Sequence, residues 1–191
     1  SGAIFDAERL EWLNGQWIRR LPQAELIERA LPFLLRSVEA AAAEGHEVRT
    51  PTPDALAPLL PMVIERLPRL DAIGPMLDFV FIEDIEVDPA LLVPKRWDAA
   101  TTVTGLSEAT QVVEALGEVS FEADELEPPL RALCEEHGWK VGDLFMAVRV
   151  AITGRKATPP LFDVMVAIGY ENTVIRLKAA QAIAAAIPSE E

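Results

Sequence analysis

Apolar residues recur every three to four positions along most of this 191-residue chain, the spacing that places them on one face of an α-helix. The longest such patterns cover residues 22–43, 99–119, 121–136, 141–153 and 171–187. Shorter helical patterns cover residues 6–13, 16–21, 54–67, 70–79 and 160–168, and the piece between Pro89 and Pro94. Residues 45–53 are typical of a loop, and residues 79–85 favour β-structure. We therefore expect an all-α protein in which residues 79–85 are the exception.

Proline and glycine positions refine this picture. The chain has 15 prolines, many of them inside helical patterns, so we expect short and bent helices rather than a regular bundle. Pro32 should kink or split the helix over residues 22–43, and Asn14-Gly15 should separate the first two patterns. Two helical subdomains that divide between residues 90 and 125 would fit these interruptions.

The connection over residues 153–163 has an unusual sequence. Gly154 stands where one helix should end, and Thr158 stands where a helix N-cap would be expected, followed by Pro159 and Pro160. Arg155 and Lys156 add two cations to the same turn. The turn is either a docking point for a polyanion or a base edge, or simply a connection between two helices.

Net charge limits the partners that this chain can have. The total is −14, and residues 71–128 contain 2 basic against 14 acidic residues. Residues 1–70 contain 8 and 10, and residues 129–191 contain 7 of each. This balance argues against a general nucleic-acid binder but leaves an RNA surface possible at the two ends of the chain.

Several kinds of chemistry lack their sequence signatures. Cys134 is the one cysteine, which excludes an internal disulfide and a cysteine-based zinc site; we expect it to be buried in a helix. His46 and His137 have no ligand partners at metal-binding spacing and are typical of loop residues. The carboxylates of residues 78–88 fit no EF-hand and indicate a solvated acidic loop. There is no phosphate-binding glycine-rich loop and no nucleophile with a paired base, so we expect no metal, no cofactor and no complete enzyme.

The sequence also indicates where the protein is located in the cell and its oligomeric state. No apolar run reaches the roughly 18 residues needed to span a bilayer, and no signal peptide is visible. We expect a cytoplasmic monomer, and we interpret Ser1-Gly2 as a cloning scar.

Two distant stretches resemble bacterial glutamyl-tRNA synthetases. The first is Phe5-Asp6 with Arg9-Leu10-Glu11-Trp12-Leu13-Asn14-Gly15-Gln16-Trp17-Ile18-Arg19, which resembles the segment that opens the helical C-terminal half, after the lysine loop of the class I catalytic domain. The second comprises Ile152-Thr153-Gly154, residues 158–163, Ile168-Gly169 and Arg176-Leu177, and it resembles the end of the anticodon-binding domain. The two motifs stand in the right order and at a fitting separation, whereas residues 40–125 match loosely.

The resemblance implies an irregular multi-helix domain that binds the anticodon loop of the glutamate tRNA. Residues 3–95 would be a helical subdomain that follows an absent catalytic domain, and residues 96–191 would be the C-terminal anticodon-binding subdomain. The two ATP signatures of class I synthetases do not occur, so this chain should not activate glutamate, although the parent enzyme would use ATP and Mg to ligate glutamate to its tRNA. The alternatives are a helical protein-interaction module that kept the fold but lost RNA binding, and a small stand-alone enzyme.

The resemblance also implies RNA-contacting residues. Arg66 matches the position that reads the third anticodon base, with Arg69 as its substitute if the alignment shifts; the alternative is a solvated residue paired with Glu65 or Asp71. Arg131 and Arg149 match basic contacts to the anticodon loop, and helical phasing leaves both at exposed positions; the alternative is ion pairs with Glu127, Glu135 or Asp143.

Other contacts are implied in the second motif. Thr158, Pro159 and Leu161 match the segment that meets the middle anticodon bases, and a helix cap with core packing is the alternative. Arg155 and Lys156 suit phosphate contacts, which fix position without reading a base. We expect Trp12 and Trp17 to pack in the core rather than to stack on bases, because Leu13 and Ile18 stand beside them.

Overall fold

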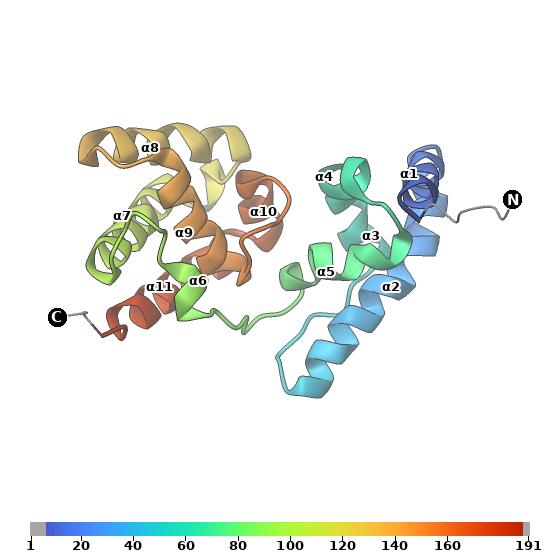
Figure 1. The fold of residues 1–191 in the computed structure, drawn as a ribbon, viewed down its shortest axis with the longest axis horizontal. Coiled ribbons are helices and arrows are strands. Elements are labelled where there is room, and N and C mark those ends of the chain that lie inside the picture. The colour runs from blue at the N-terminus through green and yellow to red at the C-terminus, as the bar shows by residue number, and fades with distance from the viewer. Residues whose placement is uncertain (1–6, 189–191) are drawn as a thin grey trace, which may run out of the picture. The chain divides into compact units, whose positions relative to one another are not determined.

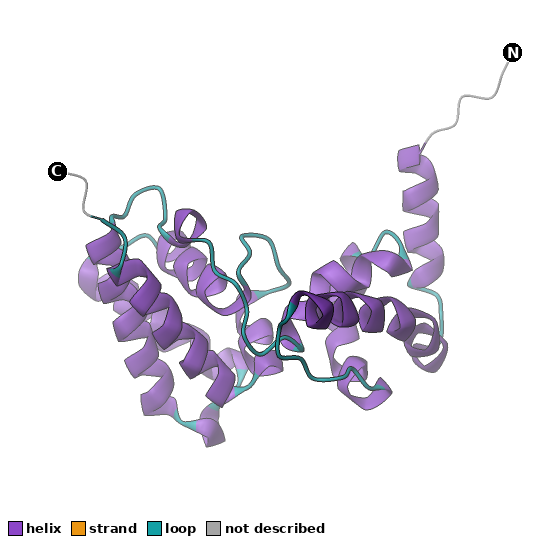
Figure 2. Cartoon of the chain, turned by 90° about the horizontal axis from the view of Figure 1, so that it is seen from below, coloured by secondary structure: helices purple, strands orange, loops and turns teal. Residues whose placement is uncertain are grey.

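The computed structural model describes residues 7–188, and over that range every regular element is helical (Figures 1 and 2). The all-α prediction is confirmed for this part of the chain. Ser1-Gly2 and the Phe5-Asp6 part of the first motif lie outside the described residues.

The chain forms two compact units, Ser1–Asp84 and Ile85–Glu191. The division falls at Asp84, upstream of the boundary at residue 95 that the resemblance implied. The reason is helix α6 (Pro89–Leu92), which packs on α9 (Val141–Thr153) and α11 (Tyr170–Ala185) and so belongs to the second unit.

The first unit contains one long helix, along which the short helices over residues 53–56 and 73–77 pack (Figure 1). Its helices are α1 (Ala7–Ile18), α2 (Gln23–Glu44), α3 (Pro53–Leu56), α4 (Leu60–Val63) and α5 (Ile73–Leu77), and single 3-10 turns cover Ala57–Leu59, Ile64–Arg66, Leu70–Ala72 and Asp78–Val80. One face of α2 carries the buried residues Leu26, Ala30, Leu34, Val38 and Ala41. Gly74 of α5 lies so close to α2 that an added Cβ would be 2.7 Å from the Cβ of Ser37.

Three details of the first unit differ from the sequence predictions. Asn14-Gly15 does not break the first helix, because the Asn14 side chain donates to the carbonyl of Pro68 at 3.0 Å and Gly15 lies against the carbonyl of Leu67. Pro32 does not split α2. The helix predicted over residues 54–67 is instead a chain of single turns, with a proline in the first turn of each of α3, Ala57–Leu59 and α4.

Residues 79–85 depart from helix, as the sequence indicated, but they form no strand among the described residues. They make an isolated antiparallel bridge between Val48 and Ile82. The N–H of Arg49 donates to the carbonyl of Phe81 at 2.7 Å, and the N–H of Glu83 donates to the carbonyl of Glu47 at 2.8 Å. This bridge ties the loop after α2 to the end of the first unit.

The second unit follows the predicted helices closely. It contains α6, α7 (Ala99–Leu116), α8 (Ala123–His137), α9, α10 (Leu161–Ile168) and α11, with a 3-10 turn at Glu118–Ser120. Helices α7, α9 and α11 pack against one another around buried residues that include Leu106, Val113, Leu144, Val148 and Leu177.

Helix α8 contains two residues, Cys134 and His137, whose surroundings the sequence predicted. Cys134 is buried there, as predicted, and burial raises the pKa of its thiol. His137 is the last residue of this helix rather than a loop residue, and it stacks on the ring of Trp139 at a centroid distance of 4.1 Å.

Candidate nucleic-acid interface

The turn after α9 is built around a glycine that no other residue could replace without strain. Gly154 caps α9 in the left-handed conformation, with φ of 70°. A Cβ at this position would lie 2.4 Å from the carbonyl oxygen of Glu86, so the turn packs directly on backbone. Thr153, only 3% exposed, donates from its hydroxyl to the carbonyl of Arg149 at 2.7 Å. The first half of the turn is therefore held in place by its contacts with the backbone of Glu86 and Arg149.

Two arginines hold the same turn in place. Arg149 is half-buried, and its Nη1 donates to the carbonyl of Pro159 at 2.8 Å and to the hydroxyl of Thr158. Arg176 of α11 is 3% exposed, and its Nη1 donates to the carbonyl of Ile152 at 2.8 Å. The Arg176 guanidinium lies at the C-terminal end of α9, where cations interact favourably with the helix dipole. Arg149, expected at an exposed position, thus contributes to the structure of the turn.

Thr158 is not the N-cap of α10, contrary to the sequence prediction. The N-cap is Pro160, which makes no side-chain cap hydrogen bond, and Thr158 donates its hydroxyl to the carbonyl of Pro159 at 2.9 Å. The cause is the pair of prolines, because a residue that precedes proline is disfavoured in helical conformation. The helix therefore begins after both prolines, at Leu161.

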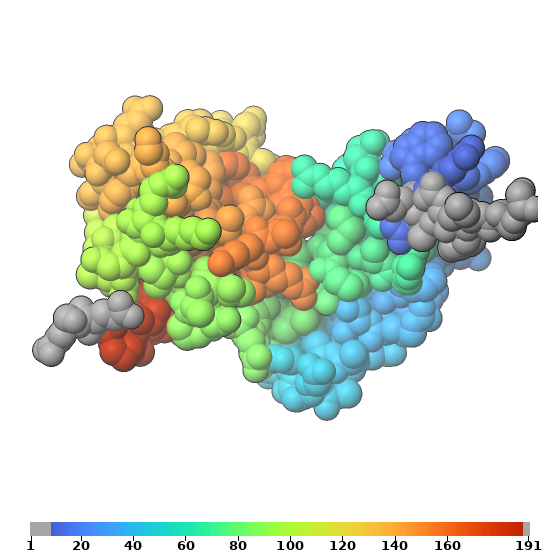
Figure 3. Space-filling view, in the orientation of Figure 1, coloured from blue at the N-terminus to red at the C-terminus, as the bar shows by residue number. Residues whose placement is uncertain are grey.

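The exposed part of the turn is small and basic. Lys156 is exposed, and Arg155 and Thr158 are half-buried. Pro159 is buried and Leu161 is 4% exposed, so their side chains pack inward. The segment that joins α9 to α10 lies at the surface of the second unit, seen in orange in Figure 3. At its surface the turn presents the charge of Lys156 beside Ala157 and Pro160, with Arg155 partly covered.

Arg131 lies on α8 beside two aromatic rings that the sequence analysis did not single out. Its Nη2 pairs with Glu127 at 2.6 Å, the partner expected in the alternative interpretation, and its guanidinium lies 5.5 Å from the ring centroid of Phe145. Phe145 in turn contacts Phe162 edge-to-face at 5.1 Å. Both rings are half-buried. A guanidinium plane next to aromatic rings is an arrangement that can stack on unpaired bases.

The sequence carried a weak signal for this pair. Phe145 lies in the apolar pattern of residues 141–153, and Phe162 follows Leu161 in the second motif. What the sequence could not show is that the packing of α9 and α10 brings the two rings together.

Arg66 and Arg69 of the first unit differ in their surroundings. Arg66 is exposed at the end of the Ile64–Arg66 turn and forms no hydrogen bond or ion pair with any described residue, so the alternative pairing with Glu65 or Asp71 does not occur. Arg69 instead binds Asp71 through two nitrogens, and it lies 3.8 Å from Glu11. This hydrogen-bonded pair lowers the pKa of the Asp71 carboxyl and raises the pKa of Arg69.

A shallow hollow adjoins Arg66. Its volume is about 330 Å³, and its lining includes Glu11, Trp12, Arg19, Glu65 and Arg66. Arg66, which has no hydrogen-bonding or ionic partner among the described residues, thus lies at the edge of a concave surface of the first unit.

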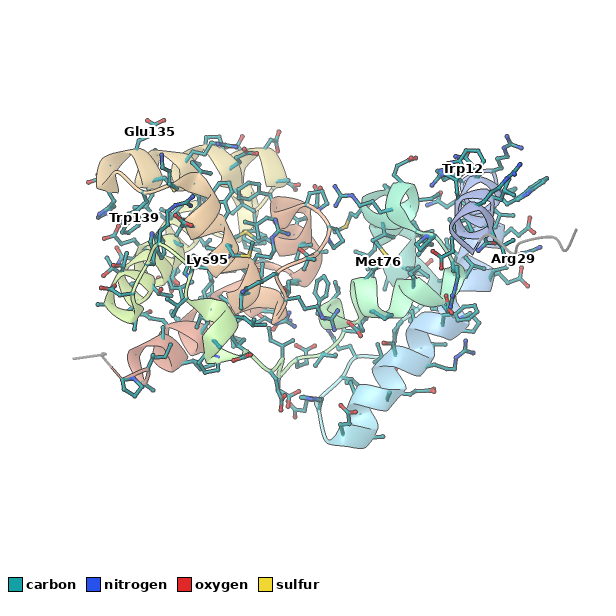
Figure 4. The ribbon with its side chains drawn as sticks, viewed as in Figure 1. Trp12, Arg29, Met76, Lys95, Glu135 and Trp139 are labelled. Carbon is teal, nitrogen blue, oxygen red and sulfur yellow. The ribbon has the colours of Figure 1, made fainter. Side chains whose placement is uncertain are left out.

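Trp12 and Trp17 are exposed, which corrects the prediction that they pack in the core. Their side chains are 61% and 65% exposed, and Figure 4 shows Trp12 on the outside of α1. Between residues 9 and 18, only Gly15 and Ile18 of this helix are buried.

Residues 7–188 contain neither a metal-binding cluster nor a membrane-spanning helix. No group of three or more His, Cys, Asp or Glu side chains is placed to hold a metal ion within that range. In the same range, no helix combines the length and the apolar character required to cross a bilayer.

Known proteins share this arrangement. Residues 25–181 match the family described as the anticodon binding domain. The chain is 44% identical over 185 residues to the glutamate–tRNA ligase of a Roseiflexus species, a match that covers 95% of this chain and 35% of that ligase. It is 35% identical over 190 residues to the glutamate–tRNA ligase of a Dehalococcoides mccartyi strain, covering 100% of this chain and 38% of the relative. The chain therefore spans about a third of the length of these relatives.

A solved structure shares the fold. The glutamate tRNA ligase from Elizabethkingia meningosepticum, crystallised in complex with its amino acid, superposes with a TM-score of 0.68 at 23% identity, over 95% of this chain and 33% of that one. The helical architecture is thus that of one part of a larger synthetase, and the chain belongs to the anticodon binding domain family.

Proposed function

We propose that this chain binds the anticodon loop of the tRNA that accepts glutamate, as the anticodon-binding portion of a glutamate–tRNA ligase. The match to the anticodon binding domain family over residues 25–181 carries this proposal. The relatives are about three times as long as the matched part. We assign the ligation reaction, with its ATP and Mg, to the part of such an enzyme outside these residues, and we place the enzyme in the cytoplasm as a monomer.

The described side chains divide into those that can reach RNA and those that shape the surface. Arg66 has a free guanidinium and reads the third anticodon base. Arg131 faces loop bases beside Phe145, and Arg155 and Lys156 contact phosphates. Arg149, Thr158, Pro159 and Leu161 act by holding the turn in the shape that meets the middle bases.

The charge of the chain sets how this binding depends on salt. Each phosphate contact on single-stranded RNA contributes about −0.7 to the slope of log affinity against log salt. Contacts from Arg155 and Lys156 therefore give a slope of roughly −1.4, so that affinity falls roughly sevenfold for a fourfold rise in salt. The slope is shallow because only two cations are assigned to phosphates.

The test is a titration of the chain with the anticodon stem-loop of a glutamate tRNA at two salt concentrations. Lys156→Ala should reduce the steepness of the slope by about 0.7. Lys95→Ala, an exposed lysine of the same unit in its acidic part, should leave the slope unchanged. No binding at either salt concentration would contradict the proposal and favour a protein-interaction module.

A further inference from the structure

The turn after α9 begins at the negative end of a helix dipole. In an α-helix the aligned peptide groups place roughly half a negative charge at the C-terminus, where the last carbonyls have no partner in the helix. Helix α9 ends at Thr153, and Arg155 and Lys156 follow within three residues. The two cations assigned to phosphates therefore lie where the helix itself repels a phosphate.

A buried arginine lies at the same helix end. Arg176 of α11 is 3% exposed, and its Nη1 donates to the carbonyl of Ile152 at 2.8 Å. An arginine keeps its proton in a protein interior, so this side chain carries a full positive charge there. A full charge exceeds the roughly half charge of the helix end. The sum of the two charges at the base of the turn is therefore positive.

Arg149 is a cation of the same turn, but it binds a different part of it. Its Nη1 donates to the hydroxyl of Thr158 and to the carbonyl of Pro159, near the start of α10. Arg176 by contrast binds a carbonyl in the last turn of α9 itself. The charge of Arg176 is thus placed to offset the negative helix end.

A neighbouring contact of α11 is made without a charge. Helix α11 packs against both α9 and α10 (Figure 1). Thr173, which is 0% exposed, donates its hydroxyl to the carbonyl of Met165 in α10 at 3.3 Å. Thr173 and Arg176 are three residues apart, so they share a face of α11. A neutral donor serves toward α10, whereas the donor toward α9 is a buried charge, whose removal from water is costly. The charge therefore has a use beyond joining the helices.

We propose that Arg176 is a positioning residue for RNA, whose buried charge offsets the negative end of α9 so that Arg155 and Lys156 can hold phosphates of the anticodon loop. Arg176 does not touch the RNA, because it is 3% exposed. It acts through its electric field, which salt screens less than the field of an exposed charge. This inference rests on the proposed function.

The expected effect of removing this charge is a loss of affinity without a change in salt dependence. A unit charge about 8 Å from a phosphate, at an effective dielectric constant of about 40, changes affinity roughly fivefold. Because the buried charge makes no phosphate contact, it releases no counterion when RNA binds. Its removal therefore differs from removal of the Lys156 charge, which reduces the steepness of the slope by about 0.7.

Three variants test the role of the charge in titrations of the whole chain with the glutamate stem-loop at two salt concentrations. Arg176→Gln keeps an N–H donor for Ile152 but no charge, and it should weaken binding about fivefold at an unchanged slope. Arg176→Lys keeps the charge and should stay within about twofold of wild type. Thr173→Val, the matched control, removes a neutral buried bond of the same helix and should leave the affinity unchanged. No loss in Arg176→Gln, or an equal loss in Arg176→Lys or Thr173→Val, would overturn the proposal.

A change in the RNA separates the effect of charge from the effect of shape. In a second stem-loop, neutral methylphosphonates replace the phosphates of the anticodon loop. The penalty of Arg176→Gln should disappear with this RNA, because no phosphate charge is left for Arg176 to act on. A penalty that persists with the neutral RNA would show that Arg176 acts through the shape of the turn alone, contrary to the proposal.

Folding and the proposed function are checked in the same samples. If Arg176→Gln lacks the helical circular dichroism of wild type, citrulline at position 176 replaces it as an uncharged analogue of nearly the same shape, introduced by ligation of a synthetic C-terminal peptide. Failure of the wild-type chain to bind the stem-loop would refute the proposed function, and this inference with it. Binding by wild type that Arg176→Gln leaves unchanged would overturn the inference alone.

Discussion

Arg66 and Arg69 are three residues apart, yet their guanidinium groups have different availability. Arg69 is bound by Asp71, so reading a base would require it to break an existing ion pair. Arg66 has no such partner among the described residues. An arginine that is free before binding loses no interaction when its planar fork of donors meets a base edge. This difference favours Arg66 as the residue that reads the third anticodon base.

The corresponding prediction concerns base preference rather than affinity alone. Arg66→Gln should reduce the preference for a glutamate stem-loop over one with the third anticodon base of a glutamine tRNA by about 1–3 kcal/mol. Arg69→Gln is the matched control and should leave that preference in place. The two preferences are measured by competition titration. Loss of preference in Arg69→Gln alone would show that the assignment belongs three residues further on.

Arg149 is expected to act through the shape of the turn. Arg149→Ala removes charge-assisted hydrogen bonds to Thr158 and Pro159, so the free energy of unfolding should fall by about 2 kcal/mol. Thr158→Val removes only one of these acceptors and should cost about 1 kcal/mol. Both values come from urea unfolding, and Arg149→Ala should weaken binding of every anticodon loop tested. Unchanged stability in Arg149→Ala would contradict the structural role.

At the scale of elements, two helix-capping glycines allow the conformational cost of an added side chain to be separated from its packing cost. Gly138 and Gly154 both cap a helix in the left-handed region, with φ of 66° and 70°. A Cβ at Gly138 would meet open space, whereas one at Gly154 would meet the carbonyl of Glu86. Gly138→Ala should therefore cost about 1 kcal/mol of unfolding free energy, from conformation alone. Gly154→Ala should cost roughly 2 kcal/mol more than Gly138→Ala, from overpacking. Both costs are measured by urea unfolding, and equal costs for the two variants would show that the turn does not pack on residues 85–88.

The cap of α7 gives a prediction about pH. The Asp98 carboxylate accepts from the N–H of Thr101 at 2.7 Å, and hydrogen bonding at Thr101 lowers the pKa of Asp98. A lowered pKa means that the stabilisation is fully present above the ordinary aspartate pKa of about 3.9 and is lost as pH falls through the folded value. Wild type should therefore exceed Asp98→Asn in stability at pH 6, and the difference should vanish near pH 2. A difference in urea midpoint that is constant over this range would contradict the assignment.

Sequence periodicity was sufficient to predict the long helices but not the short ones. The α9 prediction over residues 141–153 was confirmed to the residue, because a strong apolar face ends at a glycine cap. The prediction over residues 54–67 was too regular, since Pro58 and Pro61 allow helical turns to start but prevent them from merging. Asn14-Gly15 was misinterpreted as a break because its contacts with Leu67 and Pro68 come from distant sequence.

That the candidate residues contact RNA stays a prediction, and how they pack could not be predicted from the sequence. Arg66, Arg155 and Lys156 were identified from the sequence. The structure shows that Arg66 and Lys156 are exposed and that Arg155 is half-buried. The inward packing of Leu161 and the bonds from Arg149 depend on how α9 and α10 meet. The exposure of Trp12 and Trp17 could not be predicted either, because an apolar pattern does not show which of its side chains pack against the rest of the chain.

At the scale of the whole molecule, the chain is two helical units that carry different parts of the proposed recognition surface. Arg66 belongs to the first unit, whereas Arg131, Arg155 and Lys156 belong to the second. Reading of the third anticodon base is thus assigned to the first unit, and phosphate binding and contact with the other loop bases are assigned to the second. Changes in one unit should alter base preference, and changes in the other should alter salt dependence.

The most direct measurement is a paired titration of the intact chain. One RNA is the anticodon stem-loop of a glutamate tRNA, and the other differs from it only in carrying the third anticodon base of a glutamine tRNA. Both RNAs should bind, and the glutamate stem-loop should bind tighter by about tenfold or more. Equal affinities for the two stem-loops would contradict the claim that this chain reads the anticodon.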